Sequence, residues 1–329
     1  MRKTISFAVI LLLLLGVTFW SMTTGSIKVG FIELIDGLLN GNNEEVAVVR
    51  DLRLPRIMVS MLSGAALAVS GALLQAVMRN PLADAGVIGI SSGAGFVSVL
   101  MVTIFPAMFF WMPIFSIAGG VLAFLLVYSL SWKSGLNPMR TLLVGVAINA
   151  TFTGLGQSFN YRGSYAVTSV NQAISSIFTM KTWTDVQVLG LYGSIGLLLS
   201  LLVIPWCNML SLQDKTAGSL GLNVARARIV ISIIAVLLAS VATAVGGLIL
   251  FVGLLIPHIS RLLIGSDHKA LIPFSALAGA LLILSADTIG RTVLAPTEIP
   301  ASIIMTVIGG PFLVFMLRKG GTRIWSLIE

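Results

Sequence analysis

The chain has 329 residues, of which 57% are hydrophobic and only 10% are charged. A soluble domain usually carries about a quarter charged residues, so this composition excludes an ordinary soluble protein and indicates several crossings of a bilayer. The net charge of +8 would suggest nucleic acid in a soluble protein, but here it fits basic residues beside anionic membrane lipid. We therefore expect a multi-pass protein of the cell membrane with lipid around it and no nucleic-acid partner.

Ten apolar segments predict an all-α polytopic membrane protein, because a spanning helix needs roughly 20 mostly apolar residues. In chain order, the expected spans cover residues 5–23, 57–78, 87–105, 112–132, 140–158, 186–208, 229–245, 247–263, 270–289 and 299–317. The first is interpreted as a span and not as a signal peptide, since no clear cleavage site follows it. We expect a single transmembrane domain over residues 1–329, built from two five-helix halves at about 1–165 and 166–329.

The basic residues predict the orientation. With both termini in the cytoplasm, most of the 20 Lys and Arg residues fall on the inside, as the positive-inside rule requires. Segments 55–81 and 225–257, in the second and seventh spans, share a basic start, a small-residue-rich span and a Gly or Pro break. Inverted repeats are common in transporters, but the sequence alone leaves this repeat open.

Two polar segments are too structured to be simple connectors. The first is Arg79-Asn80-Pro81-Leu82-Ala83-Asp84-Ala85-Gly86. In it, Asn80 and Pro81 end a helix, because proline lacks an amide donor and disfavours a helical residue before it. It fits either a tight turn before closely packed helices or a constriction at the cytoplasmic end of a pathway. The second segment covers residues 211–228.

The 211–228 segment predicts a short helix, a turn and a second short helix. Ser211 and Asp214 are spaced as a capping box, and Gly221 fits a helix C-terminal stop. No Gly-x-x-x-x-Gly-Lys-Ser/Thr phosphate loop occurs in the chain, so ATP-driven transport would require another chain to hydrolyse ATP. We interpret 211–228 as the surface where such an ATPase docks, with Leu212, Ala217 and Leu220 as apolar contacts; the alternative is a membrane-surface helix without a partner.

Within the spans, ionisable residues are rare. Asp287 is the strongest candidate for an ion-coupling carboxylate, but it lies near an outer helix end, which disfavours an ion-coupled carrier. Asn149, Thr153 and Gln157 lie four residues apart and therefore on one stripe of a helix. That stripe should face protein or water, and it fits interhelical hydrogen bonding as well as a translocation pathway.

Metal binding and catalysis have little support. The single cysteine, Cys207, and the two histidines, His258 and His268, have no carboxylate cluster at ligand spacing, so we expect no bound metal, no cofactor and no catalytic residue.

On the outer side, Arg50, Arg53 and Arg56 precede the second span and Arg291 follows the ninth. They fit either docking of an acidic protein or pairing with lipid phosphate or with nearby acids, namely Asp51, Glu44, Glu45 and Glu298.

Taken together, several motifs resemble the iron–siderophore and cobalamin permeases of ATP-binding-cassette (ABC) importers. They run in order from residue 52 to 312 and comprise Leu52-Arg53-Leu54-Pro55-Arg56, Gly64-Ala65-Ala66-Leu67-Ala68, Ser70-Gly71, Gln75, Asn80-Pro81-Leu82-Ala83, Gly253-Leu254-Leu255-Ile256-Pro257-His258-Ile259-Ser260-Arg261, Asp267-His268, Ala286-Asp287, Arg291, Glu298-Ile299-Pro300 and Gly309-Gly310-Pro311-Phe312. Each motif alone is weak, but together they cover most of the chain and are specific.

The resemblance implies a permease of ten helices that pairs with a second copy or a paralogue. It implies two cytoplasmic ATPase subunits, which bind ATP and Mg and dock near Asp214–Leu222, and an outer solute-binding protein docked through Arg53, Arg56 and Arg291. It places cytoplasmic gates at Asn80 and Leu82, and less clearly at Pro138 and Met139, where this sequence departs from the family pattern. The expected function is import of a chelated metal, first an iron–siderophore, with heme or cobalamin as other cargoes. An ion-coupled secondary transporter and a membrane scaffold are the rival hypotheses.

Overall fold

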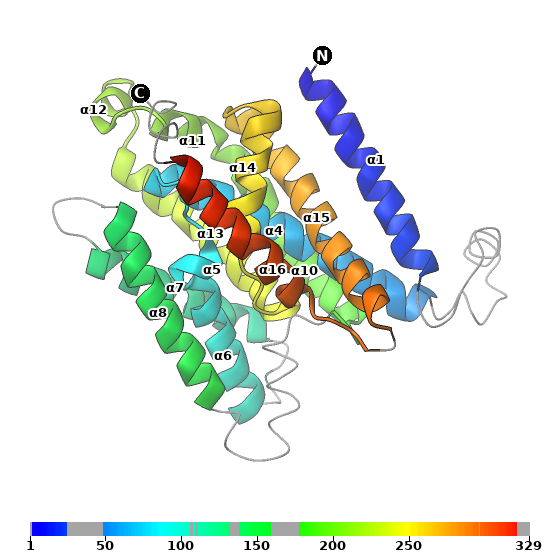
Figure 1. The fold of residues 1–329 in the computed structure, drawn as a ribbon. Helices are drawn as coiled ribbons and strands as arrows, with labels where there is room; N and C mark the ends of the chain where they lie inside the picture. Colours follow the sequence, from blue (N-terminus) through cyan, green and yellow to red (C-terminus); the bar gives the residue numbers. More distant parts are fainter. Residues whose placement is uncertain are drawn as a thin grey trace.

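The computed structural model describes residues 2–24, 49–105, 108, 111–131, 138–158, 178–295 and 297–320, and these residues form helices and connecting turns without a strand (Figure 1). The long helices are α1 (Arg2–Thr23), α4 (Leu54–Met78), α6 (Ile90–Ile104), α7 (Met112–Ser131), α8 (Pro138–Ser158), α10 (Trp183–Leu202), α13 (Val224–Gly246), α14 (Val252–Ile264), α15 (His268–Val293) and α16 (Ala301–Gly320). The shorter ones are the π-helical turn η1 (Val49–Arg53), α5 (Ala85–Ile88), α11 (Ile204–Leu210) and α12 (Asp214–Ser219).

Each of the ten expected apolar segments coincides with a helix or a broken pair of helices. The third is divided at Gly89 into α5 and α6, and the sixth at Val203 into α10 and α11. Within the described residues, six helices are long and apolar enough to cross a membrane, and three shorter helices are also apolar. The all-helical fold is confirmed, whereas the count of ten spans remains a prediction. The expected division into two halves near residue 165 lies outside the described residues.

Helix α4 is the centre of the fold and is buried along nearly its whole length. It packs against α10, α13, α14 and α15. Its inner faces carry small residues, and Gly71 approaches Gly253 of α14 so closely that a Cβ on either would overlap the other's backbone. In lipid, close packing of small residues stabilises helix association, so glycine here fixes how near α4 and α14 can come.

One end of the bundle can be identified from side-chain contacts. There, Arg2 of α1 donates to the Leu262 carbonyl of α14 over 3.0 Å, and Asn208 of α11 donates to Asp267, just before α15, over 2.8 Å. Figure 1 shows α12 and the start of α1 toward this same end. Hydrogen bonds from the Lys269 backbone and from Asn208 lower the pKa of Asp267. We call it the α12 end; its cytoplasmic location remains a prediction.

The connection between α13 and α14 is extended and not helical. Helix α13 ends at Gly246, Gly247 has a φ of 80°, and α14 begins only after Phe251, whose φ is 70°. The predicted break at Gly246 and Gly247 is confirmed, but the expected eighth span started five residues too early. Non-helical backbone at membrane depth is tolerated where protein buries it or where it lines a water-filled cavity, so the 247–251 segment belongs with the candidate site.

Candidate translocation pathway and coupling surface

The buried side chain of Asp84 connects the N-terminus of α5 to the N-terminus of α14. It is the N-cap of α5, where its Oδ2 accepts the Gly86 N–H over 3.2 Å. The backbone N–H groups of Phe251 and Gly253, at the start of α14, also interact with this buried carboxylate. Helix N-termini carry partial positive charge, so backbone amides from two segments about 170 residues apart stabilise one carboxylate. Asp84 thereby ties the turn after α4 to the extended 247–251 segment.

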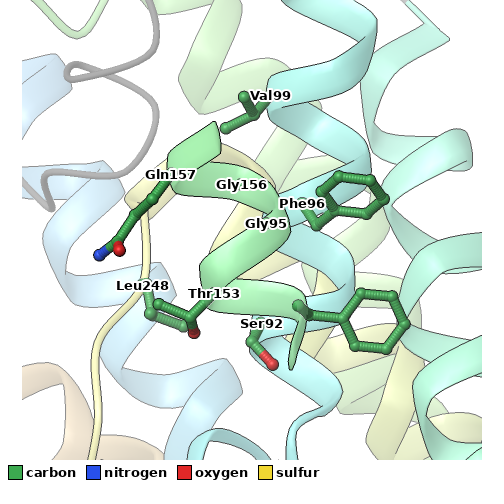
Figure 2. Close-up of a pocket in the computed structure, with 9 residues that line it drawn as sticks. Ser92, Gly95, Phe96, Val99, Thr153, Gly156, Gln157 and Leu248 are labelled. Carbon is green, nitrogen blue, oxygen red and sulfur yellow. The ribbon is translucent and has the colours of Figure 1, made fainter. Parts of the chain in front are cut away.

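A small cavity of about 40 Å³ lies beside that extended segment (Figure 2). Thr153 and Gln157 of α8, Ser92 and Phe96 of α6, and Leu248 contribute to its wall. In Figure 2, Thr153 lies near Leu248, and the amide of Gln157 points away from Phe96. The stripe residues Thr153 and Gln157 therefore lie beside the non-helical backbone, next to a cavity whose wall is mostly apolar.

Asn149, the third stripe residue, lies one turn away from the cavity. Its backbone faces Gly89, the left-handed break between α5 and α6, and its Oδ1 is buried without a hydrogen-bond partner in the described structure. A buried unpaired amide oxygen is costly. The stripe is thus not explained by interhelical hydrogen bonds at Asn149, and the pathway assignment remains a prediction.

The 211–228 segment folds differently from its predicted capping. Helix α12 covers Asp214–Ser219, and its N-cap is Gln213, not Ser211. The Ser211 hydroxyl donates to the Asn208 carbonyl over 2.6 Å, because Ser211 ends α11. The capping-box prediction was therefore wrong. The second helix is not short, since it is the beginning of α13.

The predicted C-terminal stop of α12 is confirmed. Gly221 has a φ of 88°. The Leu222 N–H donates to the Ala217 carbonyl over 3.1 Å, which is the hydrogen bond from residue six to residue one that is typical of a Schellman motif at a helix C-terminus. Leu212 and Leu220 are exposed, at 40% and 61%. Ala217 is completely buried within the chain, which corrects its expected role as a partner contact. The exposed apolar surface of this segment is therefore Leu212 and Leu220.

Asn80 and Leu82, the expected gate residues, lie in a rigid turn between α4 and α5. The Leu82 N–H donates to the Asn80 side chain over 3.0 Å, and the Ala83 N–H donates to the Asn80 carbonyl over 3.1 Å. Asn80 is buried, whereas Leu82 is partly exposed. Pro138 and Met139 form the first residues of α8, and their side chains lie outside the described part of the structure.

The three arginines expected to dock a binding protein all make contacts within the chain. Arg56 is 9% exposed and pairs with Asp287 and Glu298, at 2.8 and 3.0 Å. Burial raises the pKa of Glu298, but hydrogen bonds from Arg56 and Thr179 and the nearby positive charges of Arg56 and Arg291 together outweigh it, so that the pKa is lowered. Pairing, the alternative to docking, is thus observed for Arg56, and likewise for the exposed Arg50 with Asp51.

The other two arginines hold the end of α1. Arg53 is buried and donates to the Met22 carbonyl over 2.7 Å, and Arg291 donates to the Ser21 carbonyl and, over 2.6 Å, to its hydroxyl. Cations at a helix C-terminus stabilise its unpaired carbonyls. Docking is not tested by these contacts, but any partner would have to compete with them.

Sequence reasoning placed Arg79 and Asp84 in the first polar segment but gave neither residue a role of its own, and it missed Leu248. Asp84 stands directly before a Gly-rich helix start, a signal for an N-cap, whereas its bonds to Phe251 and Gly253 had no local signal. Leu248 follows the predicted Gly246-Gly247 break, and an apolar side chain there gave no reason to expect a cavity wall. Among the described residues, no group of three or more His, Cys, Asp or Glu could hold a metal ion.

Comparison with known proteins identifies the family. The FecCD transport family matches residues 11–319. The protein named probable heme-iron transport system permease protein IsdF is 40% identical in Staphylococcus aureus strain MSSA476 and 39% in strain Newman, each over 316 residues and 96% of both chains.

Solved structures agree on the fold. A protein described as a metal-chelate type ABC transporter in an inward-facing conformation is 29% identical, with a TM-score of 0.81 over 96% of this chain and 99% of that one. PsaBC from Streptococcus pneumoniae, solved in complex with Fab, is 16% identical with a TM-score of 0.60 over 87% of this chain and 95% of that one, a likeness of fold alone. With the family matched across nearly the whole helical bundle, the chain belongs to the FecCD transport family.

Proposed function

We propose that this chain is the membrane permease of an ABC importer whose cargo is heme. Its family makes it a transport protein of the cell membrane that imports a metal chelate and not an enzyme. The observation that carries the cargo proposal is the 40% identity, over 96% of both chains, to proteins named as heme-iron permeases. An iron–siderophore, the first cargo expected from the sequence, and cobalamin are the competing chelates.

A permease of this kind does not need to bind the metal itself. The wall formed by Thr153, Gln157 and Leu248 offers weak polar and apolar contacts but no metal ligand set. Such a path would pass a chelate without removing its metal, and cargo selection would lie in the outer binding protein. No cofactor is then required on this chain, because ATP and Mg would be bound by the ATPase.

The proposed assembly contains two permeases, two ATPase subunits and one solute-binding protein. The exposed Leu212 and Leu220 at the α12 end support an ATPase-docking surface there, since an exposed apolar pair beside a short, well-stopped helix suits a groove on a partner. The second permease is either an identical copy or a paralogue, and purification of the complex from its native membrane followed by mass analysis distinguishes the two.

The cargo is tested by uptake in cells lacking the gene. Cells complemented with the chain should accumulate iron from heme and lose that uptake when the ATPase is inactivated. Labelled ferric siderophores and cobalamin are run in parallel. Uptake of a siderophore but not of heme would overturn the cargo proposal while leaving the ABC permease intact.

Ion-coupled transport is the rival mechanism, and such carriers often use a carboxylate at membrane depth as the coupling group. Asp287, the candidate named from sequence, is 2% exposed, and both its oxygens accept hydrogen bonds from Arg56. That pairing disfavours reversible ion binding. Uptake that persists without ATP and collapses with the ion gradient would support the rival, and unchanged uptake of every chelate would support a scaffold.

A further inference from the structure

One side chain connects the docking helix α12 to the turn that carries Asn80 and Leu82. Arg79 follows directly after α4 and precedes Asn80. Its Nη2 lies 2.6 Å from Oδ1 of Asp214, the first residue of α12. No function assigned above uses Arg79.

The guanidinium of Arg79 is held from several directions. Its Nε donates to the Leu210 carbonyl at the end of α11 over 2.8 Å, and its Nη2 donates to the Leu212 carbonyl. The planar guanidinium presents donors in a fixed fork, so it fixes the end of α11 and the start of α12 relative to the backbone of residue 79. A displacement of α12 is therefore passed to that backbone.

The backbone at Arg79 makes the connection stiff. Arg79 has the left-handed conformation, with φ 46° and ψ 40°, and its N–H donates to the Gln75 carbonyl. The next residue, Asn80, donates its own N–H to the same carbonyl over 3.3 Å and fixes Leu82 through its side chain. Movement at Arg79 would thus reach Leu82 through the hydrogen-bonded Asn80 and through Pro81, whose ring fixes its φ.

Asp214 has a second partner that serves as an internal comparison. Arg228 of α13 donates to the same Oδ1 over 3.1 Å, but Arg228 leads into a long helix and not into the Asn80–Leu82 turn. Both pairs are partly solvated, with side chains 18–49% exposed, and pairs of this kind contribute little to stability. The role of the Arg79–Asp214 contact is therefore to hold α12 in position relative to the Asn80–Leu82 turn, and not to stabilise the fold.

We propose that Arg79 is the positioning residue that transmits movement of α12, through Asp214, to the cytoplasmic gate at Asn80 and Leu82. This rests on the proposed function, in which an ATPase moves α12. It assigns the transmission to one ion pair and predicts that the Arg228 pair at the same carboxylate does not share it.

The test uses the complex of the full chain with its ATPase in lipid nanodiscs. The only native cysteine, Cys207, is fully buried, so a Cys207→Ser, Leu82→Cys chain reports gate accessibility by its rate of reaction with a water-soluble maleimide. We expect this rate to change at least several-fold between nucleotide-free and ATP-plus-vanadate states. Arg79→Gln should abolish the change while ATP hydrolysis and co-purification with the ATPase persist, and Arg228→Gln should preserve it.

Asp214→Asn and Asp214→Glu form the second pair of variants. The asparagine keeps the shape but removes the charge and should lose the nucleotide response, whereas the glutamate keeps the charge and should retain much of it. These variants leave the bonds of Arg79 to Leu210 and Leu212 in place, so they decide the question even if Arg79→Gln fails to assemble.

The proposal is overturned if Arg79→Gln or Asp214→Asn responds to nucleotide like the parent, or if Arg228→Gln loses the response equally. Failure of the proposed function is distinguishable from this. In that case the parent chain itself would show no ATPase binding and no nucleotide-dependent labelling, and both proposals would fall.

Discussion

Arg56 and Asp287 form a buried ion pair in which Nε and Nη2 of the arginine donate to both carboxylate oxygens, each over 2.8 Å. Removing one partner of a buried pair costs about 3–5 kcal/mol, because it leaves the other charge unpaired. We predict that Arg56→Gln lowers the stability of the purified protein by that order, measured by thermal unfolding in detergent. The control is Arg50→Gln, which breaks an ion pair whose side chains are 58% and 53% exposed and should leave the unfolding temperature nearly unchanged, because solvent screens exposed pairs.

The same pair changes the expectation for a test of docking. If these arginines served only to dock a binding protein, changing Arg53, Arg56 and Arg291 together to Glu would abolish docking and leave the fold intact. Because all three hold other elements of the chain, the triple variant should instead be misfolded in the membrane. Recovery of a well-folded triple variant that merely loses binding-protein affinity would contradict this internal role.

Close packing at Gly71 gives a third prediction. A methyl group there would overlap the backbone of Gly253, and overpacking of this kind typically costs about 1–3 kcal/mol. Gly71→Ala should therefore lower the unfolding temperature. Gly190→Ala is the matched control, because Gly190 lies inside α10 with no atom near its would-be Cβ; there alanine should stabilise the helix by up to about 1 kcal/mol. Equal effects of the two changes would show that α4 and α14 can separate.

The docking surface gives a fourth prediction. Leu220→Ser should reduce co-purification of the ATPase without lowering the amount of permease in the membrane, since Leu220 is 61% exposed. Leu202→Ser, at a leucine 75% exposed on α10, is the control and should leave co-purification unchanged. Ala217→Arg, by contrast, should lower the amount of folded permease, because Ala217 is completely buried. Normal ATPase recovery with Leu220→Ser would place the docking surface elsewhere.

The pathway can be tested by single cysteines in a Cys207→Ser background. Thr153→Cys and Leu248→Cys, on the cavity wall, should react with a water-soluble maleimide, and addition of heme should slow the reaction. Ile249→Cys is the control, because Ile249 is 2% exposed and should react at least tenfold more slowly. Equal rates at residues 248 and 249 would exclude the 247–251 segment as a hydrated wall.

Much of the fold was predictable from local features of the sequence. The apolar segments indicated where helices form, and the stops at Arg79-Asn80-Pro81, at Gly221 and at Gly246-Gly247 were found because proline and glycine act on their own backbone. The break at Val203 was missed although Pro205 marks it: the proline stands in the first turn of α11, where its missing amide donor costs nothing.

Features that depend on distant partners were not predictable. The pairing of Arg56 was only one of several possibilities, because Asp287 lies 231 positions away. The expected capping box at Ser211 failed because α11 extends to Leu210 and uses that serine at its own end. Ala217 looked like a contact residue because its size suits a close approach, but its burial depends on how α12 packs against α11 and α13.

The glycine contacts of α4 have a consequence for how the protein can move. Gly64 is packed against Gly279 of α15 and Gly71 against Gly253 of α14, and the Gln75 side chain both donates to the Gly253 carbonyl over 2.9 Å and accepts from Arg261. Such backbone-to-backbone surfaces have no side chains that could slide or change rotamer, so α4, α14 and α15 should behave as one rigid body. The hinges of a transport cycle then have to lie outside it, at the Gly89 break and at the α10–α11 junction, where the chain already changes direction.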